Sequence, residues 1–585
     1  MTLADAVSAA LAPSSSRAFR ILVLRQLTVE PIAPFLTVGG RNLGLEIEVR
    51  FGGFDTMMQD TLSDTLWIES PDVIIVIPSP SRFSPKLVDN FYNLSEGEIG
   101  RSIAETAANA EGLIQAIRNK STRPILWFGI YKLSGLSLGL SDQRLGERSQ
   151  ARALIKVNWL VEDILKKYGS GWVIDIESCK SRIGEDRFVD PIRRFATATP
   201  FTSSGFREIA FECLKYLRNI TGTRKKVLAL DCDNTLWGGL AGEVGYEGVD
   251  LDAQSFPGGA HIELQRLAAS LSIRGVLIVL VSKNEPSSVW SVFDQRSEMV
   301  LRRSDISASR INWERKPENL ASLSKELNLG LESFVFVDDQ IAEIEAVRRF
   351  CPEVETLHLT EATLKDFNRI VSTVGWFESL TITDVDRTRT QIYQSNLVRD
   401  VARSEAVSLE SYLRELEMEL KLTIDSRVDI DRAAQMCQRT NQFNLTNKRH
   451  SPADIEIFIN SPDACVISLS VKDKFGSLGD VALLILRYEV DIAYIDTMLL
   501  SCRAFGRFCE HALLSEAISR AMKRGTKRLI GEYVPTNRNQ IVSNFWQQNG
   551  FVISADSESI QSCVRELPAE FEIFSDVFKL IEIEE

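Results

Sequence analysis

The feature that most constrains the fold is residues 227–235, where an apolar run breaks into two carboxylates, Asp231 and Asp233. Four apolar residues bounded by charge predict a buried strand. In an open parallel sheet, ligands bind just beyond the carboxyl ends of the strands. Asp231 and Asp233 are therefore predicted to face a ligand at the edge of such a sheet.

Two later apolar runs also end in polar side chains. Residues 275–281 are followed by Ser282-Lys283-Asn284, residues 334–337 by Asp338-Asp339, and Lys316 lies between these runs. Mg²⁺ prefers oxygen ligands, and a few carboxylates plus a substrate phosphate suit it. A lysine and a hydroxyl offset phosphoryl charge while the metal shields it from an attacking carboxylate. The pattern predicts a phosphate-handling Mg²⁺ site. The alternative is a Rossmann-like sheet whose acidic strand ends are merely solvated.

In this order the segments resemble the four signature motifs of the haloacid dehalogenase (HAD) superfamily of phosphohydrolases. The resemblance implies that Asp231 is the nucleophile toward phosphorus and that Asp233 is the general acid and base. It assigns substrate binding to Thr235, Ser282, Lys283, Asn284 and Lys316. It assigns the metal to Asp231, the main-chain carbonyl of Asp233, and Asp338, with Asp339 beside it.

Composition sets the outer bounds. At 585 residues the chain is too long for one core and predicts three or four structural units. Its 44% hydrophobic and 25% charged residues are typical of soluble proteins, and no run of about eighteen apolar residues predicts a membrane span. Residues 1–12 contain Asp5 and no basic region, so we expect a helix there and not a signal peptide.

Charge and cysteine usage narrow the partners and the compartment. A net charge of −13 argues against nucleic acid as the main partner, because phosphate backbones are held by basic surfaces. Nine cysteines, an odd number without CxxC pairs, predict free thiols in a reducing cytoplasm. The four histidines are far apart in sequence, so we do not expect a histidine-based metal cluster.

We predict three α/β domains, over residues 1–220, 221–375 and 405–585, with a linking helix over 376–404. In the first domain, apolar runs alternate with amphipathic stretches such as 151–167, the rhythm of βα units around a parallel sheet. These runs are residues 21–24, 73–77, 125–128 and 173–176.

The first domain weakly resembles the three-layer α/β SGNH-hydrolase fold. That family needs a serine after the first strand and an Asp-x-x-His pair near the end. This chain has Arg25-Gln-Leu-Thr28 and Asp190-Pro-Ile-Arg193 at these places. We therefore expect a domain without hydrolase activity that serves as a docking module.

The second domain is expected to be a HAD-type Rossmannoid sheet with little or no cap. Between Thr235 and the next strand there is room only for a loop and a helix around residues 261–271. The opening should then admit something bulky, such as a protein-borne arm. Charge and helical spacing over residues 384–403 predict an exposed connecting helix.

The third domain resembles the mixed α/β core of GNAT acyltransferases. A strand-like run at 494–500 leads through Ser501-Cys-Arg503-Ala-Phe-Gly506-Arg507 into a helical stretch at 508–519, and a strand at 528–533 follows. In that family the loop presents N–H groups at a helix N-terminus to the coenzyme A pyrophosphate. Phe508 occupies the last small-residue position, so we expect free coenzyme A to be crowded out and a pantetheine arm to be less affected.

The domain order, together with the motifs at 231–239, 281–284, 440–446 and 501–503, closely resembles FkbH-type proteins. In that family the protein takes the glyceryl group from 1,3-bisphosphoglycerate, removes phosphate, and loads the group as a thioester on an acyl carrier protein for polyketide or related biosynthesis. The family commonly has Asn-Pro where this chain has Gln340-Ile341, which leaves the metal ligands intact.

Cys232 has two interpretations. If its sulfur faces the site, Mg²⁺ and Lys316 would lower the pKa of the thiol, and the thiolate would attack an acyl phosphate to give the glyceryl thioester that the family resemblance implies. Alternatively, strand-end alternation turns it into the core as a small buried hydrophobe.

The carrier contacts are predicted in the third domain. The amides of Asn441, Gln442 and Asn444 would pair with a pantetheine arm, or would instead stabilise a helix end. Arg503 and Arg507, around Gly506, would bind the carrier's phosphate. Candidates for a basic docking patch are Lys448-Arg449 and Lys523-Arg524.

Three functions follow from the sequence. The first is an acyl-loading enzyme, the second is a plain Mg²⁺ phosphatase, and the third is a non-catalytic scaffold in a biosynthetic assembly.

Overall fold

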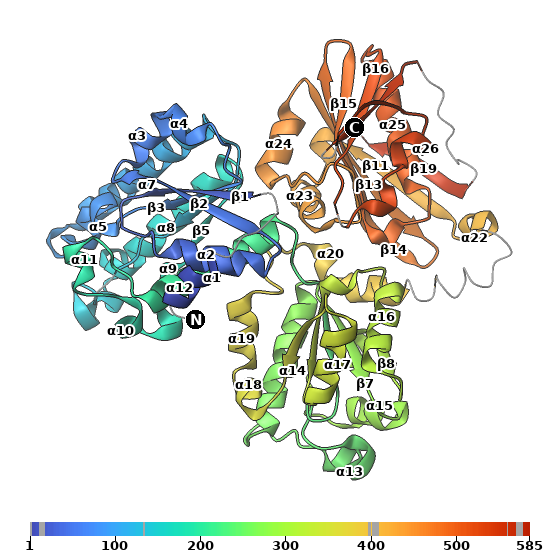
Figure 1. The fold of residues 1–585 in the computed structure, drawn as a ribbon, viewed down its shortest axis with the longest axis horizontal. Coiled ribbons are helices and arrows are strands. Elements are labelled where there is room, and N and C mark those ends of the chain that lie inside the picture. The colour runs from blue at the N-terminus through green and yellow to red at the C-terminus, as the bar shows by residue number, and fades with distance from the viewer. Residues whose placement is uncertain are drawn as a thin grey trace. The chain divides into compact units, whose positions relative to one another are not determined.

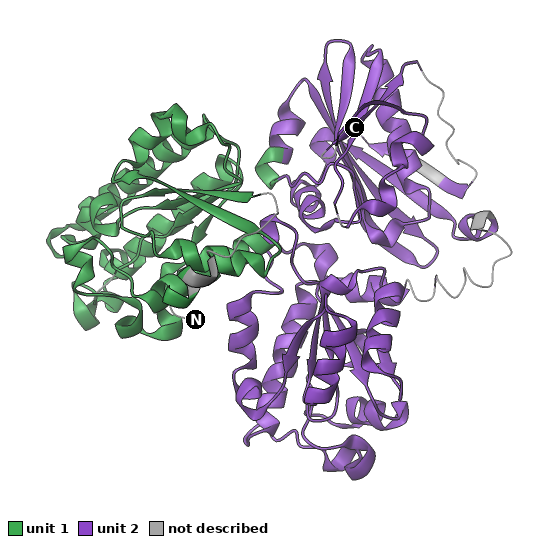
Figure 2. Ribbon diagram, in the orientation of Figure 1, with its two compact units in different colours: residues 1–218, 451–454 green, residues 219–450, 455–585 purple. Residues whose placement is uncertain are grey.

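A computed structural model describes residues 3–10, 18–132, 135–395, 399, 409–536, 538–557, 560–568 and 577–584. The chain forms two compact units (Figure 2), one of residues 1–218 with 451–454 and one of residues 219–450 with 455–585. The described strands form three sheets (Figure 1), one in the first unit and two in the second. The α/β fold class predicted from the sequence is confirmed.

The sheet of the first unit is parallel throughout, with the order β2-β1-β3-β4-β5. Its strands are β1 (Ala18–Arg25), β2 (Glu46–Phe54), β3 (Val73–Ile77), β4 (Ile125–Phe128) and β5 (Gly171–Ile174). The longer helices of this region are α2 (Ile32–Arg41), α7 (Glu96–Arg118), α8 (Gln150–Lys167), α9 (Ile176–Ile183) and α12 (Ser203–Ile220). The N-terminal helix expected from the sequence is α1 (Leu3–Ala10).

One strand of this sheet differs from the prediction. A strand was expected over residues 173–176, but β5 ends at Ile174. The carboxylate of Asp175 accepts a hydrogen bond from the amide of Ser178 at 3.0 Å and caps α9, so Ile176 is already helical. Asp190, the other position compared with hydrolases, accepts hydrogen bonds from the amides of Ile192 and Arg193 and so stabilises a turn.

The second sheet is also parallel and has the order β10-β9-β6-β7-β8. Its strands are β6 (Val227–Leu230), β7 (Leu277–Ser282), β8 (Ile306–Ile311), β9 (Phe334–Asp338) and β10 (Glu355–His358). Leu228 and Leu230 enter one apolar cluster and Val227 and Ala229 enter another, so both faces of the central strand are covered. This explains why the sequence of β6 is uniformly apolar and does not alternate.

Helices surround this second sheet (Figure 1). They are α13 (Ala241–Gly248), α14 (Gly258–Ile273), α15 (Pro286–Gln295), α16 (Lys316–Glu326), α17 (Ile341–Phe350), α18 (Glu361–Lys365) and α19 (Phe367–Val374). Between Thr235 and β7 the sequence predicted one helix, whereas the structure has both α13 and α14. These two helices are all the regular structure in that insertion.

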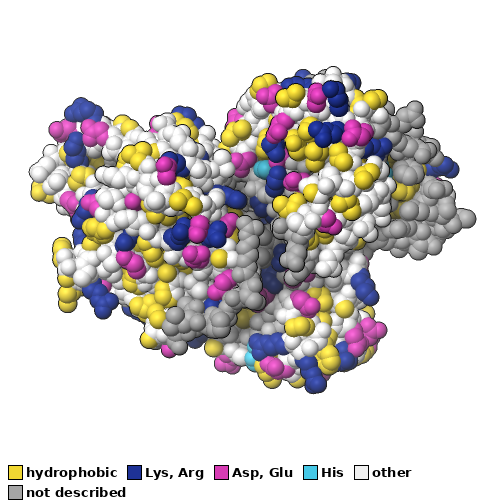
Figure 3. Space-filling model, turned by 45° about the horizontal axis from the view of Figure 1, so that its top comes forward, with side chains coloured by type: hydrophobic (Ala, Val, Ile, Leu, Met, Phe, Trp, Pro, Cys, Tyr) yellow, Lys and Arg dark blue, Asp and Glu magenta, His cyan; other side chains and the backbone are white. Residues whose placement is uncertain are grey.

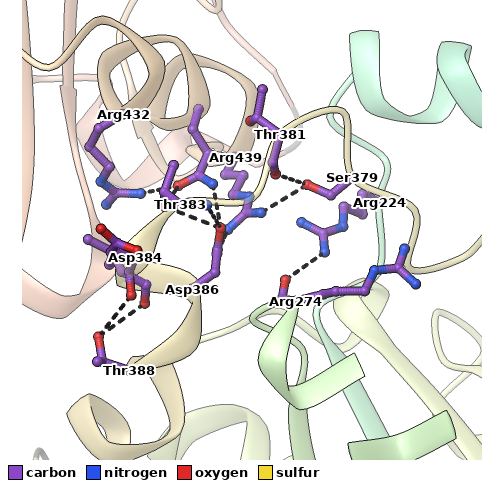
Figure 4. Close-up of polar contacts among 12 residues, drawn as sticks. Arg224, Arg274, Ser379, Thr381, Thr383, Asp384, Asp386, Thr388, Arg432 and Arg439 are labelled. Carbon is purple, nitrogen blue, oxygen red and sulfur yellow. Dashed lines mark hydrogen bonds and ion pairs between the residues drawn. The ribbon is translucent and has the colours of Figure 1, made fainter. Parts of the chain in front are cut away.

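The predicted exposed linking helix is wrong in two respects. The described part of residues 376–404 contains two helical pieces, α20 (Asp384–Arg387) and residues 389–395. Asp386 is 1% exposed and Tyr393 is 4% exposed, so this segment has a buried face as well as an exposed one. The charge of Asp386 is compensated because Arg439 pairs with it and Thr383 donates its amide to it (Figure 4). Residues 396–398 and 400–408 lie outside the described residues.

The third sheet is mixed and has the order β17-β18-β16-β15-β14-β13-β11-β19 among the described residues, with β12 pairing to β15. Its strands are β11 (Met418–Ile424), β12 (Phe443–Asn444), β13 (Ala464–Asp473), β14 (Gly476–Glu489), β15 (Ile492–Leu500), β16 (Arg528–Tyr533), β17 (Val552–Asp556), β18 (Gln561–Glu566) and β19 (Phe578–Glu584). Helices α22 (Leu409–Glu415), α23 (Ile430–Arg439), α24 (Pro452–Asn460), α25 (Cys509–Lys523) and α26 (Phe545–Gln548) accompany it.

Strands β15 and β16 of this sheet are parallel neighbours that pair over only part of their length. The two strands pair from Ile492 with Arg528 to Ile495 with Gly531, and then separate. Beyond that point β12 pairs with the end of β15, and the amide of Val534 donates to the carbonyl of Leu445. Residues 443–445 therefore lie in the gap where β15 and β16 diverge.

No helix in the described part of the chain is both long and apolar enough to cross a membrane. On the face drawn in Figure 3, acidic and basic side chains are interspersed.

Candidate active site

Three parallel strands bring their carboxyl ends to one edge of the second sheet. Asp231 directly follows β6, Ser282 is the last residue of β7, and Asp338 is the last residue of β9. The register aligns them, because Leu230 pairs with both Leu280 and Val337. Lys316, the first residue of α16, reaches the same edge. Asp231, Asp338 and Lys316 thus meet at this edge as predicted, and Ser282 ends the neighbouring strand.

Lys316 is shared between two buried carboxylates. Its Nζ lies 2.8 Å from Oδ1 of Asp231 and 2.6 Å from Oδ2 of Asp338. The side chains of Lys316, Asp231 and Asp338 are 2%, 5% and 0% exposed. The second oxygen of Asp338 accepts the amide of Gln340 at 2.8 Å, so the carboxylate is fixed at both ends.

Asp231, Asp338 and Lys316 together carry two negative charges and one positive charge when ionised. The pKa values of Lys316 and Asp338 are both raised. Burial would lower the pKa of Lys316, but Asp231 and Asp338 raise it above its usual value. Burial raises the pKa of Asp338 to about 6; the ammonium of Lys316 opposes the shift and Asp231 adds to it. Two carboxylates around one ammonium leave an excess charge of one, which disfavours ionisation of the last carboxyl.

The residues fit a hard divalent cation. Oxygen atoms of Asp231, Asp338 and Asp339 all lie within 4.8 Å of one another. Among the described residues, Oδ1 of Asp339 is buried without a hydrogen-bond partner. Burial, and then the charge of Asp231, raise the pKa of Asp339. An all-oxygen set with an orphaned oxygen and excess negative charge is the environment that Mg²⁺ prefers.

The carboxylate of Asp233 accepts hydrogen bonds from three donors. Its Oδ1 accepts hydrogen bonds from Nε1 of Trp237 at 2.9 Å and from the amide of Ala241 at 3.0 Å. Its Oδ2 accepts from Nδ2 of Asn284 at 2.9 Å. Burial nevertheless raises the pKa of Asp233, and the charge of Asp231 adds to that effect. These three hydrogen bonds fix its side chain in place. Its role as general acid and base, and metal binding by its carbonyl, stay predictions.

The other residues predicted to bind substrate differ in their surroundings. Ser282 and Thr235 are buried at the site, and Oγ1 of Thr235 has no hydrogen-bond partner among the described residues. Asn284 donates to the carboxylate of Asp233, and its contact with substrate stays a prediction. Lys283 is different: its Nζ pairs with Oε1 of Glu343 at 2.6 Å, so it is already engaged with α17.

Cys232 is buried in the core, with no exposed surface. It packs in the same apolar cluster as Leu230 and Trp237. Burial, followed by the charge of Asp231, raises the pKa of the Cys232 thiol well above its usual value, although Ser282 and Lys316 act in the opposite direction. The position of Cys232 therefore agrees with the alternative of a small buried side chain, because desolvation outweighs the lysine. Lowering of its pKa by Mg²⁺ stays a prediction.

Sequence reasoning missed four residues that hold the site together. Besides Trp237, they are Asn234, whose Nδ2 donates to Asp339 at 3.3 Å, His358, whose ring contacts the carbonyl of Asp339, and Gln340 through its amide. Trp237 and Asn234 lie within the 231–239 motif, so their spacing offered a signal. His358 comes from the neighbouring strand β10, and only the sheet order places it there.

In segment 440–446, the amide side chains of Asn441 and Asn444 are hydrogen-bonded within the protein. Asn444 is fully buried; its Nδ2 donates to the carbonyl of Thr440, and its Oδ1 accepts the amide of Asn447. Oδ1 of Asn441 accepts from Arg449 at 2.7 Å. Asn444 thus takes the alternative predicted role of stabilising a helix end, and Gln442, which is half-buried, lines a cavity.

The two arginines predicted to bind phosphate, Arg503 and Arg507, have different surroundings. Arg507 lies 3.2 Å from Oδ2 of Asp473, which also pairs with Arg399, so Arg507 belongs to a buried ion-pair network. Arg503 lines the cavity that Gln442 lines. Gly506, at φ +69°, has open space around its Cα, and Phe508 precedes α25 in the left-handed region at φ +59°.

Lys448 and Arg449, predicted to form a basic docking patch, contact other residues of the protein. Arg449 donates to the carbonyls of Cys437, Gln438 and Thr440 at the C-terminal end of α23, where a cation is favourable. Lys448 pairs with Asp496 at 2.5 Å. The expectation of a free Lys448-Arg449 patch is therefore wrong, whereas Lys523 and Arg524 are exposed.

A solved structure shares the fold over part of this chain. The chain is similar to the N-terminal part of the protein BF1531 from Bacteroides fragilis, which contains a phosphatase domain and was crystallised with Mg; identity is 23%, the TM-score is 0.57, and the match covers 65% of this chain and all of the other. A ribosomal-protein-S18-alanine N-acetyltransferase from Escherichia coli matches 26% of this chain and 97% of its own at 16% identity and a TM-score of 0.20. No protein-family model and no curated protein matches the sequence.

Proposed function

We propose that the chain is a Mg²⁺-dependent phosphate-transferring enzyme of the HAD type. The observation that carries the proposal is the cluster of Asp231, Asp338 and Asp339, with Lys316 paired to two of them, at the carboxyl edge of a parallel sheet. The phosphatase domain and Mg of the similar solved structure support the proposal.

The residues define a two-step reaction. Bound Mg²⁺ would offset the negative charge of the phosphoryl group. An oxygen of Asp231 attacks phosphorus, the bond from phosphorus to the leaving oxygen breaks, and Asp233 gives that oxygen a proton. Asp233 then takes a proton from the water that releases phosphate from Asp231. Lys316 and Ser282 hold the phosphate oxygens, and Trp237 and Asn284 hold Asp233 in place.

The first test removes the nucleophile. We expect Asp231→Asn to lower phosphatase turnover on the order of 10³-fold or more, because an amide does not attack phosphorus. Release of phosphate from a phosphorylated three-carbon acid, measured with Mg²⁺, is the assay. Asp294→Asn, which changes a half-exposed carboxylate paired with Arg303, is the matched control and should keep full turnover. Turnover retained in Asp231→Asn would exclude this site as the reaction centre.

The fuller proposal is that the enzyme loads a carrier. By its resemblance to FkbH-type proteins, it would transfer the glyceryl group of 1,3-bisphosphoglycerate to the phosphopantetheine thiol of an acyl carrier protein. The carrier sulfur would bond to the acyl carbon, the bond from that carbon to the phosphate oxygen would break, and inorganic phosphate would leave with the proton of the thiol. The Asp231 site would then hydrolyse the remaining phosphate ester. The motifs at 440–446 and 501–503, which lie in the same compact unit as the Asp231 site, support this proposal.

Intact-mass analysis separates the candidate functions. Incubation of enzyme, Mg²⁺, 1,3-bisphosphoglycerate and a phosphopantetheinylated carrier should add a glyceryl group to the carrier. Phosphate release without a heavier carrier indicates a plain phosphatase, and no turnover at all indicates a scaffold. Replacing Cys232 with Ser distinguishes the acyl route, because a hydroxylamine-sensitive acyl-enzyme should disappear only if that thiol carries the group.

A further inference from the structure

A cavity of about 60 Å³ in the second unit is lined by an unusual number of cations. Its basic lining residues are Lys226, Arg389, Arg432, Arg439 and Arg503, and its acidic lining residues are Asp386 and Glu332. The basic residues come from the position just before β6, the linking segment 389–395, α23 and the turn after β15, and the acidic ones come from α20 and the turn before β9. The lining therefore has a formal surplus of positive charge.

Asp386 is already committed to one of these cations. It pairs with Arg439, and it also accepts the amide of Thr383 at 2.9 Å and Nε2 of Gln435 at 2.6 Å, as Figure 4 shows for its labelled partners. It is 1% exposed. One buried carboxylate with this many donors has little capacity left to compensate the other cations.

Three of the cations contact only neutral oxygens among the described residues. Nζ of Lys226 donates to the carbonyl of Arg439 at 2.9 Å. Arg432 donates to Gln435 and to the carbonyl of Asp480, and its Nε is buried without a partner although the residue is only 6% exposed. Arg503 donates to Oγ of Ser501 at 3.2 Å and to the same carbonyl at 3.4 Å.

Electrostatics support the shortage of negative charge. Burial lowers the pKa of Lys226 to about 8 and that of Arg432 to about 9; neighbouring arginines add to both shifts, whereas Cys502 and Glu332 oppose that of Lys226. Burial would also lower the pKa of Arg389, but Tyr393 and Asp386 raise it. Burial and Arg389 lower the pKa of Arg503. Buried cations that repel one another are costly unless an anion joins them.

Size and position restrict what that anion is. One buried water needs on the order of 10–15 Å³, so the cavity holds a handful of water-sized groups and is far too small for a nucleotide. Lys226 lies at the amino end of β6 and Asp231 follows its carboxyl end. Five residues at about 3.3 Å each separate them by about 16 Å, so the cavity is at the opposite edge of the sheet from the metal cluster.

We propose that this cavity is a second phosphate-group site, separate from the Asp231 centre. Guanidinium groups match phosphate oxygens in geometry and charge, and the neutral donors of Ser501 and Gln442 lie in the same lining. The phosphate belongs either to a pantetheine arm or to a small metabolite. A pantetheine arm as the source rests on the carrier-loading function proposed above. The proposal that the cavity binds a phosphate group does not depend on that function.

Calorimetric titration of the full chain in EDTA tests the site. The probes are orthophosphate, 3-phosphoglycerate and pantetheine 4′-phosphate, each at low ionic strength. We expect Arg503→Gln to weaken binding of the preferred probe at least tenfold, while Lys527→Gln, which removes an exposed lysine, leaves it unchanged. If Arg503→Gln does not fold, as judged by circular dichroism, Arg389→Gln takes its place.

A second variant keeps the result separate from the proposed function. Binding should persist in Asp231→Asn, because that residue is at the other edge of the sheet. Equal binding to wild type and Arg503→Gln, loss of binding in Asp231→Asn, or no binding of any probe at millimolar concentration would each overturn the proposal. Tenfold tighter binding of pantetheine 4′-phosphate than of 3-phosphoglycerate identifies the arm as the source, and the reverse order identifies a metabolite.

Cysteine labelling gives an independent readout. Cys502 lines the cavity and is the one half-buried cysteine, whereas the other eight are buried. Its alkylation by iodoacetamide, followed by peptide mass spectrometry, should slow at least fivefold when the preferred phosphate probe is present. An unchanged rate at a saturating probe concentration would contradict occupation of the cavity.

Discussion

At the scale of single residues, Lys316 links the two buried carboxylates of the candidate site. Its ammonium group is enclosed between Asp231 and Asp338, and all three side chains are at most 5% exposed. Buried ions are tolerated only when their partners remain, since removing one partner leaves an uncompensated charge in a medium of low polarity. The lysine therefore has a structural function in addition to the phosphate contact proposed for it.

Replacing Lys316 with Met should reveal both functions. We expect the variant to be less stable by about 3 kcal/mol in EDTA, because two carboxylates then face each other without a counter-charge. Mg²⁺ should raise the melting temperature of the variant more than that of the wild type, because the cation replaces the lost positive charge. Differential scanning calorimetry with and without Mg²⁺ measures both effects. Equal responses of the two proteins to Mg²⁺ would contradict a shared site.

Trp237 is a positioning residue for Asp233. Trp237→Phe keeps most of the apolar volume and removes the indole N–H that lies 2.9 Å from Oδ1 of Asp233. We expect kcat to fall about tenfold with little change in KM, because a hydrogen bond to an ionisable group is lost while the phosphate contacts remain. Steady-state kinetics check this, and a rise in KM at constant kcat would instead indicate a role in substrate binding.

At the scale of elements, the ends of strands were predictable and the partners of charged loops were not. Asp231, Ser282 and Asp338 follow apolar runs, and parallel strands necessarily end at one edge, so the sequence alone places them together. Arg507 could not be assigned in this way, because its partner Asp473 is at the end of β13, 34 residues earlier. The same applies to Asn444, whose burial depends on the separation of β15 from β16.

The backbone of Phe508 leads to a test of coenzyme A binding. A non-glycine residue in the left-handed region costs about 1 kcal/mol or more, and here the ring stands at the start of α25. Phe508→Gly removes both the strain and the ring, so the helix N–H groups become accessible to a pyrophosphate.

We expect Phe508→Gly to bind free coenzyme A at least tenfold more tightly than the wild type, as measured by calorimetry. Phe508→Leu is the matched control, because it keeps a bulky side chain at the same backbone position and should bind as weakly as the wild type. Equal affinity of the glycine and leucine variants would show that the ring does not control access.

At the scale of the whole molecule, the linking segment determines how the second unit is built. The sequence predicted an exposed helix because its charges are dense, but Asp386 is buried against Arg439 and Gln435 of α23. A long-range ion pair of this kind cannot be read from periodicity, since its two members are 53 residues apart. The cation-lined cavity was missed for the same reason, because its residues come from separate parts of the sequence.

Replacing Asp386 with Asn tests this link through its pH dependence. Burial would raise the pKa of Asp386, but Arg439 prevails and lowers it to about 2, from an ordinary value of 3.8. A lowered folded-state pKa means that the ionised carboxylate stabilises the fold above about pH 4, and that this contribution is lost as the pH falls from about 4 to about 2.

We therefore expect Asp386→Asn to lower the free energy of unfolding by about 2 kcal/mol at neutral pH, with the difference from wild type shrinking below about pH 4. Chemical denaturation at a series of pH values measures it. Asp384→Asn, a change at an exposed position on the same helix, is the control. A difference between wild type and Asp386→Asn that stays constant from pH 7 to pH 3 would show that the loss comes from shape or hydrogen bonding and not from the charge of Asp386.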